Sequence, residues 1–124
     1  MTGARGTVCV VDDDADIREI LNDLLSAEGY EVIVAGDGQT ALNRLRARKD
    51  ECGLIILDLM MPRMNGWEFR RKQLADATVA GIPVVLLTGA GNAAKAIEEL
   101  DVAGIMEKPV DLDTLLAKVA LYCA

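Results

Sequence analysis

The first thing this 124-residue chain lacks is histidine, which does not occur at all. Its absence excludes histidine-based acid–base catalysis, Ser-His-Asp triads, histidine-ligated metals and a phosphohistidine on this chain. Cysteine is scarce, because Cys9, Cys52 and Cys123 are the only three and they form no CxxC pattern. The odd count and wide spacing indicate reduced thiols, with Cys9 a small core residue inside an apolar run.

The sequence also lacks a long apolar run and an excess of basic charge. No stretch approaches the ~18–20 apolar residues that cross a bilayer, and the N-terminus has no signal-peptide core. We therefore expect a cytoplasmic protein with no membrane contact. The formal net charge is −7, and an acidic surface repels nucleic acid phosphates, so we expect no nucleic acid partner. The length predicts a single domain.

What the chain does contain is a set of short apolar runs that end at polar residues able to do chemistry. Residues 8–11 precede Asp12, Asp13 and Asp14; residues 54–57 precede Asp58; residues 84–87 precede Thr88; and residues 104–107 precede Lys108 and Pro109. Apolar residues at helical spacing follow each run, predicting helices over about 15–28, 39–48, 66–74, 93–100 and from 111 onward. Residues 31–35 form a further short strand.

This alternation predicts an α/β fold. We expect a doubly wound (βα)₅ sandwich with helices on both faces of a five-stranded parallel sheet. All the strands then point the same way, and their carboxyl ends meet at one edge, where ligands of open α/β sheets bind. The polar residues should therefore converge in one shallow cleft.

Such a cleft suits a divalent cation and a phosphoryl group. Adjacent residues at a strand end point in opposite directions, so one of Asp12 and Asp13 binds the cation directly and the other through water. Asp58 adds a third carboxylate, and Mg²⁺ is the natural occupant. Asp58 is also the best-placed nucleophile toward phosphorus, and Thr88 and Lys108 would meet the growing negative charge.

These motifs resemble the receiver domain of bacterial two-component response regulators, including the chemotaxis type. The resemblance runs from about Thr7 to the C-terminus, and its motifs are VVDDD at 10–14, LDLMMPRMNG at 57–66, PVVLLTG at 83–89 and EKPV at 107–110. It implies a single receiver domain over 1–124 with a core at about 7–122, and a flavodoxin-like fold with the strand order 2-1-3-4-5.

The resemblance also assigns roles. Asp58 would be the phosphoacceptor, and Mg²⁺ or Mn²⁺ would be held by Asp13, by Asp58, by the Met60 backbone carbonyl and by Asp12 through water. Thr88 and Lys108 would bind the phosphoryl group, Gly89 would leave room for it, and the Lys108–Pro109 peptide would be cis. One position departs from the family: Ile105 stands where many members carry a tyrosine or phenylalanine that takes part in the switch.

The implied function is Mg²⁺-dependent phosphoryl transfer from a phosphohistidine donor to Asp58. The donor would be a histidine kinase or a His-phosphotransfer protein. Phosphorylation would switch contacts with a downstream protein target in two-component signal transduction. The chain would catalyse only its own phosphorylation and dephosphorylation, so it is not expected to be an enzyme, and it should be a monomer or a weak dimer. No output domain follows the last helix, so we expect the output to be a protein–protein contact if the chain stands alone.

Other interpretations fit less well. An EF-hand loop starting at Asp12 fails because Ile17 and Asp23 stand where glycine and glutamate are required. An aspartyl phosphatase would need an Asp-x-Asp signature at a strand end and a cap domain, and a Rossmann site would need a glycine-rich turn. The main alternative is a receiver-like docking module that no longer switches on phosphorylation, which Ile105 favours. We interpret the basic run at 70–72 as a solvated face.

Overall fold

The computed structural model describes residues 5–48, 51–89, 91 and 93–123, and strands and helices alternate along them. The elements are β1 (Thr7–Val11), α1 (Ala15–Ala27), β2 (Glu31–Ala35), α2 (Gly38–Ala47), β3 (Cys52–Asp58), α3 (Gly66–Leu74), β4 (Val84–Thr88), α4 (Ala93–Glu99), β5 (Gly104–Glu107) and α5 (Leu112–Cys123). Every expected strand and helix is present. Strand β3 begins two residues before the apolar run that predicted it.

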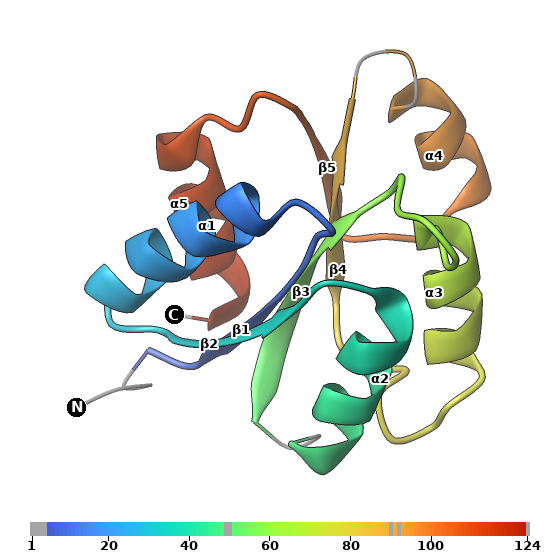
Figure 1. The fold of residues 1–124 in the computed structure, drawn as a ribbon, viewed down its shortest axis with the longest axis horizontal. Coiled ribbons are helices and arrows are strands. Elements are labelled where there is room, and N and C mark those ends of the chain that lie inside the picture. Colours follow the sequence, from blue (N-terminus) through green and yellow to red (C-terminus); the bar gives the residue numbers. More distant parts are fainter. Residues whose placement is uncertain (1–4, 49–50, 90, 92, 124) are drawn as a thin grey trace.

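The five strands form one parallel sheet in the order β2-β1-β3-β4-β5, which confirms the predicted doubly wound topology. Figure 1 shows α1 and α5 on one face of the sheet and α2, α3 and α4 on the other. All the strands therefore deliver their carboxyl ends to the same edge. The loops β1–α1, β3–α3, β4–α4 and β5–α5 leave from that edge.

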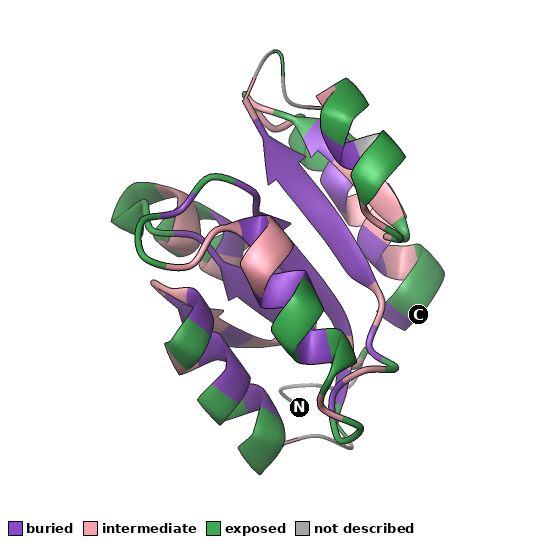
Figure 2. Ribbon diagram, turned by 90° about the vertical axis from the view of Figure 1, so that its right-hand side faces the viewer, coloured by how far each residue is buried: buried purple, intermediate pink, exposed green. Residues whose placement is uncertain are grey.

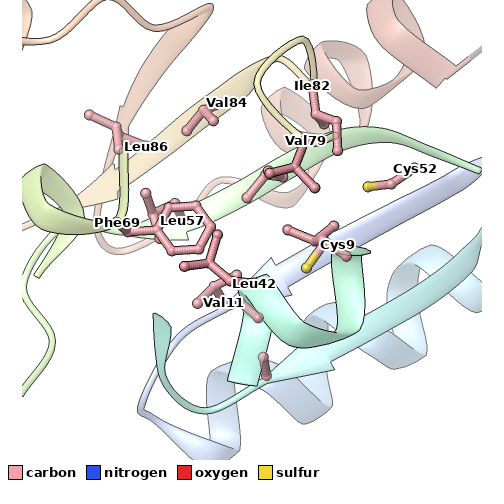
Figure 3. Close-up of a cluster of buried hydrophobic side chains, with 14 of the residues drawn as sticks. Cys9, Val11, Leu42, Cys52, Leu57, Phe69, Val79, Ile82, Val84 and Leu86 are labelled. Atoms are coloured by element: carbon pink, nitrogen blue, oxygen red, sulfur yellow. The ribbon is translucent and has the colours of Figure 1, made fainter. Parts of the chain in front are cut away.

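The core has two layers because successive strand residues point to opposite faces of the sheet. In β3, Ile55 and Leu57 pack with buried residues of α2 and α3, whereas Leu54 and Ile56 pack with buried residues of α1 and α5. Burial is almost continuous along the central strands in Figure 2. Figure 3 shows the layer that contains Leu42, Leu57 and Phe69.

Caps fix where the helices next to the site begin. The Asp14 carboxylate accepts hydrogen bonds from the backbone N–H groups of Asp16 and Ile17, so α1 starts directly behind the acidic end of β1. Asn65 and Glu68 form a reciprocal capping box at the start of α3. Both helices thus begin within a few residues of the strand ends.

The solvated face predicted at 70–72 is confirmed for Arg71 and Lys72, which are exposed, and is wrong for Arg70. Arg70 is buried; its guanidinium donates to the Asp101 carbonyl at 2.6 and 3.0 Å and to Gln73 Oε1 at 2.8 Å. Burial lowers the pKa of Arg70, and the Asp101 charge opposes that shift. Arg70 therefore ties α3 to the connection between α4 and β5. None of the helices in the described part of the chain combines the length and hydropathy needed to span a bilayer.

Candidate functional site

The carboxyl edge of the sheet gathers three carboxylates. Asp12 and Asp13 follow β1, Asp58 ends β3, and one oxygen from each lies within 4.8 Å of the others. Asp12 is fully buried and Asp58 is 4% exposed, whereas Asp13 is open to solvent. Because β1 and β3 are neighbours in the sheet, these residues from distant parts of the sequence meet at one point.

Lys108 brings the balancing positive charge from the loop after β5. Its Nζ lies 3.2 Å from Asp12 Oδ2 and 3.5 Å from Asp58 Oδ1. The Lys108 backbone N–H donates to the Thr88 carbonyl at 2.8 Å, which extends the pairing of β5 with β4. The Lys108–Pro109 peptide is cis, as the family resemblance implied. One ammonium is thus shared between two buried carboxylates.

Backbone groups orient the two buried carboxylates. The Asp14 N–H donates to Asp12 Oδ1 at 2.9 Å, and the Met60 N–H donates to Asp58 Oδ1 at 3.2 Å. The other oxygen of Asp12, Oδ2, is buried and makes no directed hydrogen bond within the described residues, so its contact is the Lys108 ammonium. A buried carboxylate oxygen without a hydrogen-bond donor is suited to binding a cation.

Crowding of like charges changes the acidity of the site. Burial and the neighbouring Asp12 charge raise the pKa of Asp58 to about 6, against the opposing effects of Lys108 and the Met60 N–H. Burial works against the charged form of Lys108, but attraction to Asp12 and Asp58 outweighs it and raises the pKa of Lys108. The negative charge of the three carboxylates therefore exceeds the positive charge that Lys108 supplies.

The donor set fits a hard divalent cation. All three side chains offer carboxylate oxygens, the ligands that Mg²⁺ and Mn²⁺ prefer, and two oxygens on opposite sides of a bound Mg²⁺ are about 4.2 Å apart. The spread of up to 4.8 Å among the acidic oxygens matches that span after small side-chain movements. The site can therefore hold a metal of the kind expected from the sequence.

Thr88, Gly89 and Ile105 take no part in the ion pairs of the acidic cluster. Thr88 is buried at the end of β4, and its hydroxyl donates to the Gly89 carbonyl at 3.3 Å. A Cβ placed on Gly89 would meet no described atom within 4 Å, so no steric contact requires glycine there. Ile105 is half-buried and packs against the core layer on the α4 side, beside Leu100 and Val102.

The loop after Asp58 is held close to its own strand. The Gly66 N–H donates to the Leu59 carbonyl at 2.7 Å, and a Cβ on Gly66 would lie 2.9 Å from Leu59 Cα. Between them, Arg63 takes a left-handed backbone conformation with φ of 65°. The tight turn fixes the residues directly after the Asp58 carboxylate.

Sequence reasoning missed Arg18, whose Nη1 donates to the Asp12 carbonyl at 2.7 Å. A signal was present, because long side chains on a helix lean toward its N-terminus. Arg18 is the fourth residue of α1, so its side chain can return to the strand that the helix follows.

An apolar groove borders the site on the side of α1 and the β5–α5 loop. It encloses about 200 Å³ and is lined by Ile17, Ile20, Leu21, Lys108, Pro109, Val110 and Leu112. Ile20 is 53% exposed and Leu112 is 38% exposed. The Lys108 side chain thus has the acidic cluster on one side and an open apolar surface on the other.

Known proteins are similar to this chain in both sequence and fold. The profile of the response regulator receiver domain matches residues 8–120. The DNA-binding response regulator MtrA of Mycobacterium tuberculosis is 36% identical over 121 residues, which cover 96% of this chain and 51% of MtrA. The response regulator PleD of Caulobacter vibrioides is 41% identical over 115 residues, 90% of this chain and 25% of PleD.

Among solved structures, a response regulator receiver protein from Pseudomonas putida is 33% identical, with a TM-score of 0.84 over 94% of this chain and 96% of that one. The chain thus spans about half the length of MtrA and a quarter of PleD, but nearly all of the Pseudomonas protein.

Proposed function

The chain belongs to the response regulator receiver domain family, and we propose that Asp58 accepts a phosphoryl group from a phosphohistidine donor. Receivers act in phosphorylation-driven signalling and are not classical enzymes. The observation that carries the proposal is the convergence of Asp12, Asp13, Asp58 and Lys108 at one edge of the sheet. We take residues 7–122 as the core of one receiver unit.

In the transfer step, a carboxylate oxygen of Asp58 attacks the phosphorus atom. An oxygen–phosphorus bond forms, the phosphorus–nitrogen bond to the donor imidazole breaks, and its electron pair stays on the nitrogen. The attacking carboxyl must be ionised, and its pKa of about 6 leaves it mostly ionised at neutral pH. The Met60 N–H keeps the carboxylate oriented during the attack.

Charge compensation falls to groups already around Asp58. Lys108, which pairs with two carboxylates in this structure, would pair with the phosphoryl oxygens, and the Thr88 hydroxyl would donate to one of them after rotating from the Gly89 carbonyl. Asp13 and Asp58 would hold Mg²⁺ or Mn²⁺ with the Met60 carbonyl, and Asp12 would act through water. The bound ion would supply positive charge opposite the transferred oxygens.

A histidine kinase or a His-phosphotransfer protein would dock on the apolar groove beside the site. The donor histidine must reach Asp58, and this groove lies against Lys108, which contacts Asp58 directly. Exposed Ile20 and Leu112 favour an apolar helical face on the donor. The reduced state of the three cysteines supports a cytoplasmic location, where such donors meet receivers.

Intact-protein mass spectrometry after incubation with acetyl phosphate and Mg²⁺ tests the proposal. The protein should gain one phosphoryl group, and chelation of Mg²⁺ or the Asp58→Asn substitution should abolish the gain. Asp16→Asn, which removes an exposed carboxylate from the first turn of α1, is the matched control and should label normally. Beryllofluoride, which mimics the aspartyl-phosphate, gives a second readout through Trp67 fluorescence.

The competing function, a docking module that no longer switches on phosphorylation, predicts one of two results with Mg²⁺ present: no phosphoryl gain in the wild-type protein, or a gain that leaves the structure unchanged. The half-buried Ile105 is the observation that favours it, because an aliphatic side chain cannot replace the aromatic readout of other receivers. A labelled Asp58 together with an unchanged structure would also support this alternative.

A further inference from the structure

We propose that Arg18 is a positioning residue for metal binding, acting through the backbone between Asp12 and Asp13. The inference rests on the proposed function, because it assigns a residue that prepares the same site. Arg18 Nη1 donates to the Asp12 carbonyl at 2.7 Å. That carbonyl belongs to the peptide unit that joins the two acidic residues, so its direction sets how both side chains leave the backbone.

A network of backbone bonds surrounds this peptide, and Arg18 completes it. The Asp12 N–H is held by the Ala35 carbonyl at 3.1 Å, and the Asp14 N–H by Asp12 Oδ1 at 2.9 Å. The Arg18 N–H in turn donates to the Asp14 carbonyl at 3.1 Å. With its side chain on the Asp12 carbonyl, Arg18 holds the peptide unit between Asp12 and Asp13, which none of these other bonds contacts.

The Arg18 guanidinium lies close to the backbone of Gly36. A Cβ placed on Gly36, in the loop after β2, would lie 3.1 Å from Arg18 Nη1 and 3.4 Å from Cζ. Gly36 does not have a positive φ, so its backbone conformation gives no separate reason for glycine. A side chain at position 36 would therefore displace the Arg18 guanidinium by a few tenths of an ångström from the place where it donates to the Asp12 carbonyl.

The charge and the hydrogen bond of Arg18 act on metal affinity in opposite directions. A guanidinium close to the site repels a divalent cation, so loss of the charge alone would tighten metal binding. Loss of the hydrogen bond releases the Asp12–Asp13 peptide and weakens binding, because groups that orient metal ligands are typically worth about 10–100-fold in affinity. The sign of the change therefore distinguishes positioning from simple electrostatics.

The test is calorimetric titration of the unphosphorylated protein with Mg²⁺. Arg18→Met should weaken Mg²⁺ binding about tenfold, and Arg18→Lys, which keeps the charge and one donor, should recover part of the loss. The matched control is Arg44→Met, because Arg44 Nη1 also donates to a backbone carbonyl, that of Val34 in β2. This control should bind Mg²⁺ like the wild-type protein.

Gly36→Ala perturbs the same contact from the opposite side without changing any charge. It should weaken Mg²⁺ binding about threefold, and it should have no further effect in the Arg18→Met background, because the contact is already lost there. Gly81→Ala is its control, since a Cβ at Gly81 meets nothing within 4 Å. Amide hydrogen exchange at residues 12–14 should be faster in Arg18→Met than in the wild-type protein.

Mg²⁺ affinity in Arg18→Met equal to or tighter than that of the wild-type protein would overturn the inference, as would an equal loss in Arg44→Met. Urea unfolding in the presence of chelator checks that each variant is folded. If Arg18→Met does not fold, Arg18→Lys and Gly36→Ala decide the question by the same criterion. A wild-type protein that binds Mg²⁺ and labels at Asp58 while these variants bind normally would leave the proposed function intact and remove only the role of Arg18.

Discussion

Asp58 is held in a site that disfavours its own charge. It is almost completely buried, it lies in one acidic cluster with Asp12, and it shares a single ammonium with that neighbour. The carboxyl keeps its proton to about pH 6 in the folded protein, whereas the unfolded chain releases it near pH 4. The free energy of unfolding therefore falls as the pH rises from about 4 to about 6, and the full penalty is present above pH 6.

We predict that Asp58→Asn stabilises the metal-free protein at pH 8. The free energy of unfolding should increase by about 1–3 kcal/mol, and the increase should disappear below about pH 4. The free energy of unfolding of both proteins is measured by urea unfolding in the presence of a chelator at several pH values. Added Mg²⁺ should raise the stability of the wild-type protein and have little effect on the variant.

Asp76 is a control because its pKa is shifted in the opposite direction from that of Asp58. The hydrogen bonds from Arg46 and Thr78 lower the pKa of Asp76 to about 2, so its charge stabilises the fold above about pH 4 and stops doing so as the pH falls through 2. Asp76→Asn should therefore destabilise the protein at pH 8. A loss of stability in Asp58→Asn at pH 8 would contradict the charge-crowding account.

Arg63 offers a second test of a single residue. Its φ of 65° is unfavourable for any side chain, and its ion pair with Asp37, at 3.8 Å, is too exposed to compensate. Arg63→Gly should raise the free energy of unfolding by about 0.5–1 kcal/mol relative to Arg63→Ala, which keeps the strain and loses the same charge. Equal stability of the two variants in urea would show that the turn is unstrained.

Helix α3 is the element whose role differs most from its sequence pattern. Its polar residues Arg70 and Gln73 are buried, and Gln73 donates to the carbonyls of Val79 and Ile82 at 3.0 and 2.9 Å. Together they connect α3 to the segment before β4 and to the segment before β5. The helix thus contacts the segments that lead into β4, which ends at Thr88, and into β5, which precedes Lys108.

We predict that Arg70→Met lowers the free energy of unfolding by about 1–3 kcal/mol, because Gln73 Oε1 loses its donor inside the protein. Arg71→Met, which changes the exposed neighbour, should alter stability by less than about 0.5 kcal/mol. Urea denaturation of the two variants side by side gives the comparison. Similar losses in both would show that helix propensity, and not the buried network, is responsible.

The boundaries of the elements followed from local patterns, and the contacts between elements did not. Asp14 and Gly29 flank an apolar stripe, so α1 could be placed from the sequence to within a residue or two. Arg70 could not be placed, because whether an arginine on a helix meets solvent or a carbonyl depends on the packing of distant segments. Asp12 and Asp58 could be brought together, since a parallel sheet aligns its strand ends whatever the details of its packing.

Across the whole molecule, the strands of the sheet differ in how much burial and strand pairing protect them. Strand β1 is fully buried and pairs with β2 and β3, whereas β5 has four residues, pairs only with β4, and has Met106 as its one buried residue. Lys108 is attached to this less protected strand. Local unfolding of β5 would therefore move Lys108, the residue whose positive charge balances the carboxylates of the site.

Hydrogen exchange should reproduce this order. Backbone amides of β1, β3 and β4 should exchange slowest and approach the global unfolding free energy, and those of β5 and the seven-residue α4 should exchange at least about tenfold faster. Peptide-level mass spectrometry under native conditions measures these exchange rates. Equal protection of β3 and β5 would mean that the sheet opens only as one unit.

The buried cysteines have a practical consequence for spectroscopy. Burial raises the pKa of Cys9 and Cys123 above the ordinary thiol range and that of Cys52 to about 11, so the folded protein presents almost no thiolate at neutral pH. Maleimide dyes and spin labels react with thiolate. A cysteine introduced on the outer surface, such as Leu121→Cys at a position 76% exposed, should be modified selectively while the three native thiols stay in place. Site-directed probes can therefore be attached without first building a cysteine-free background.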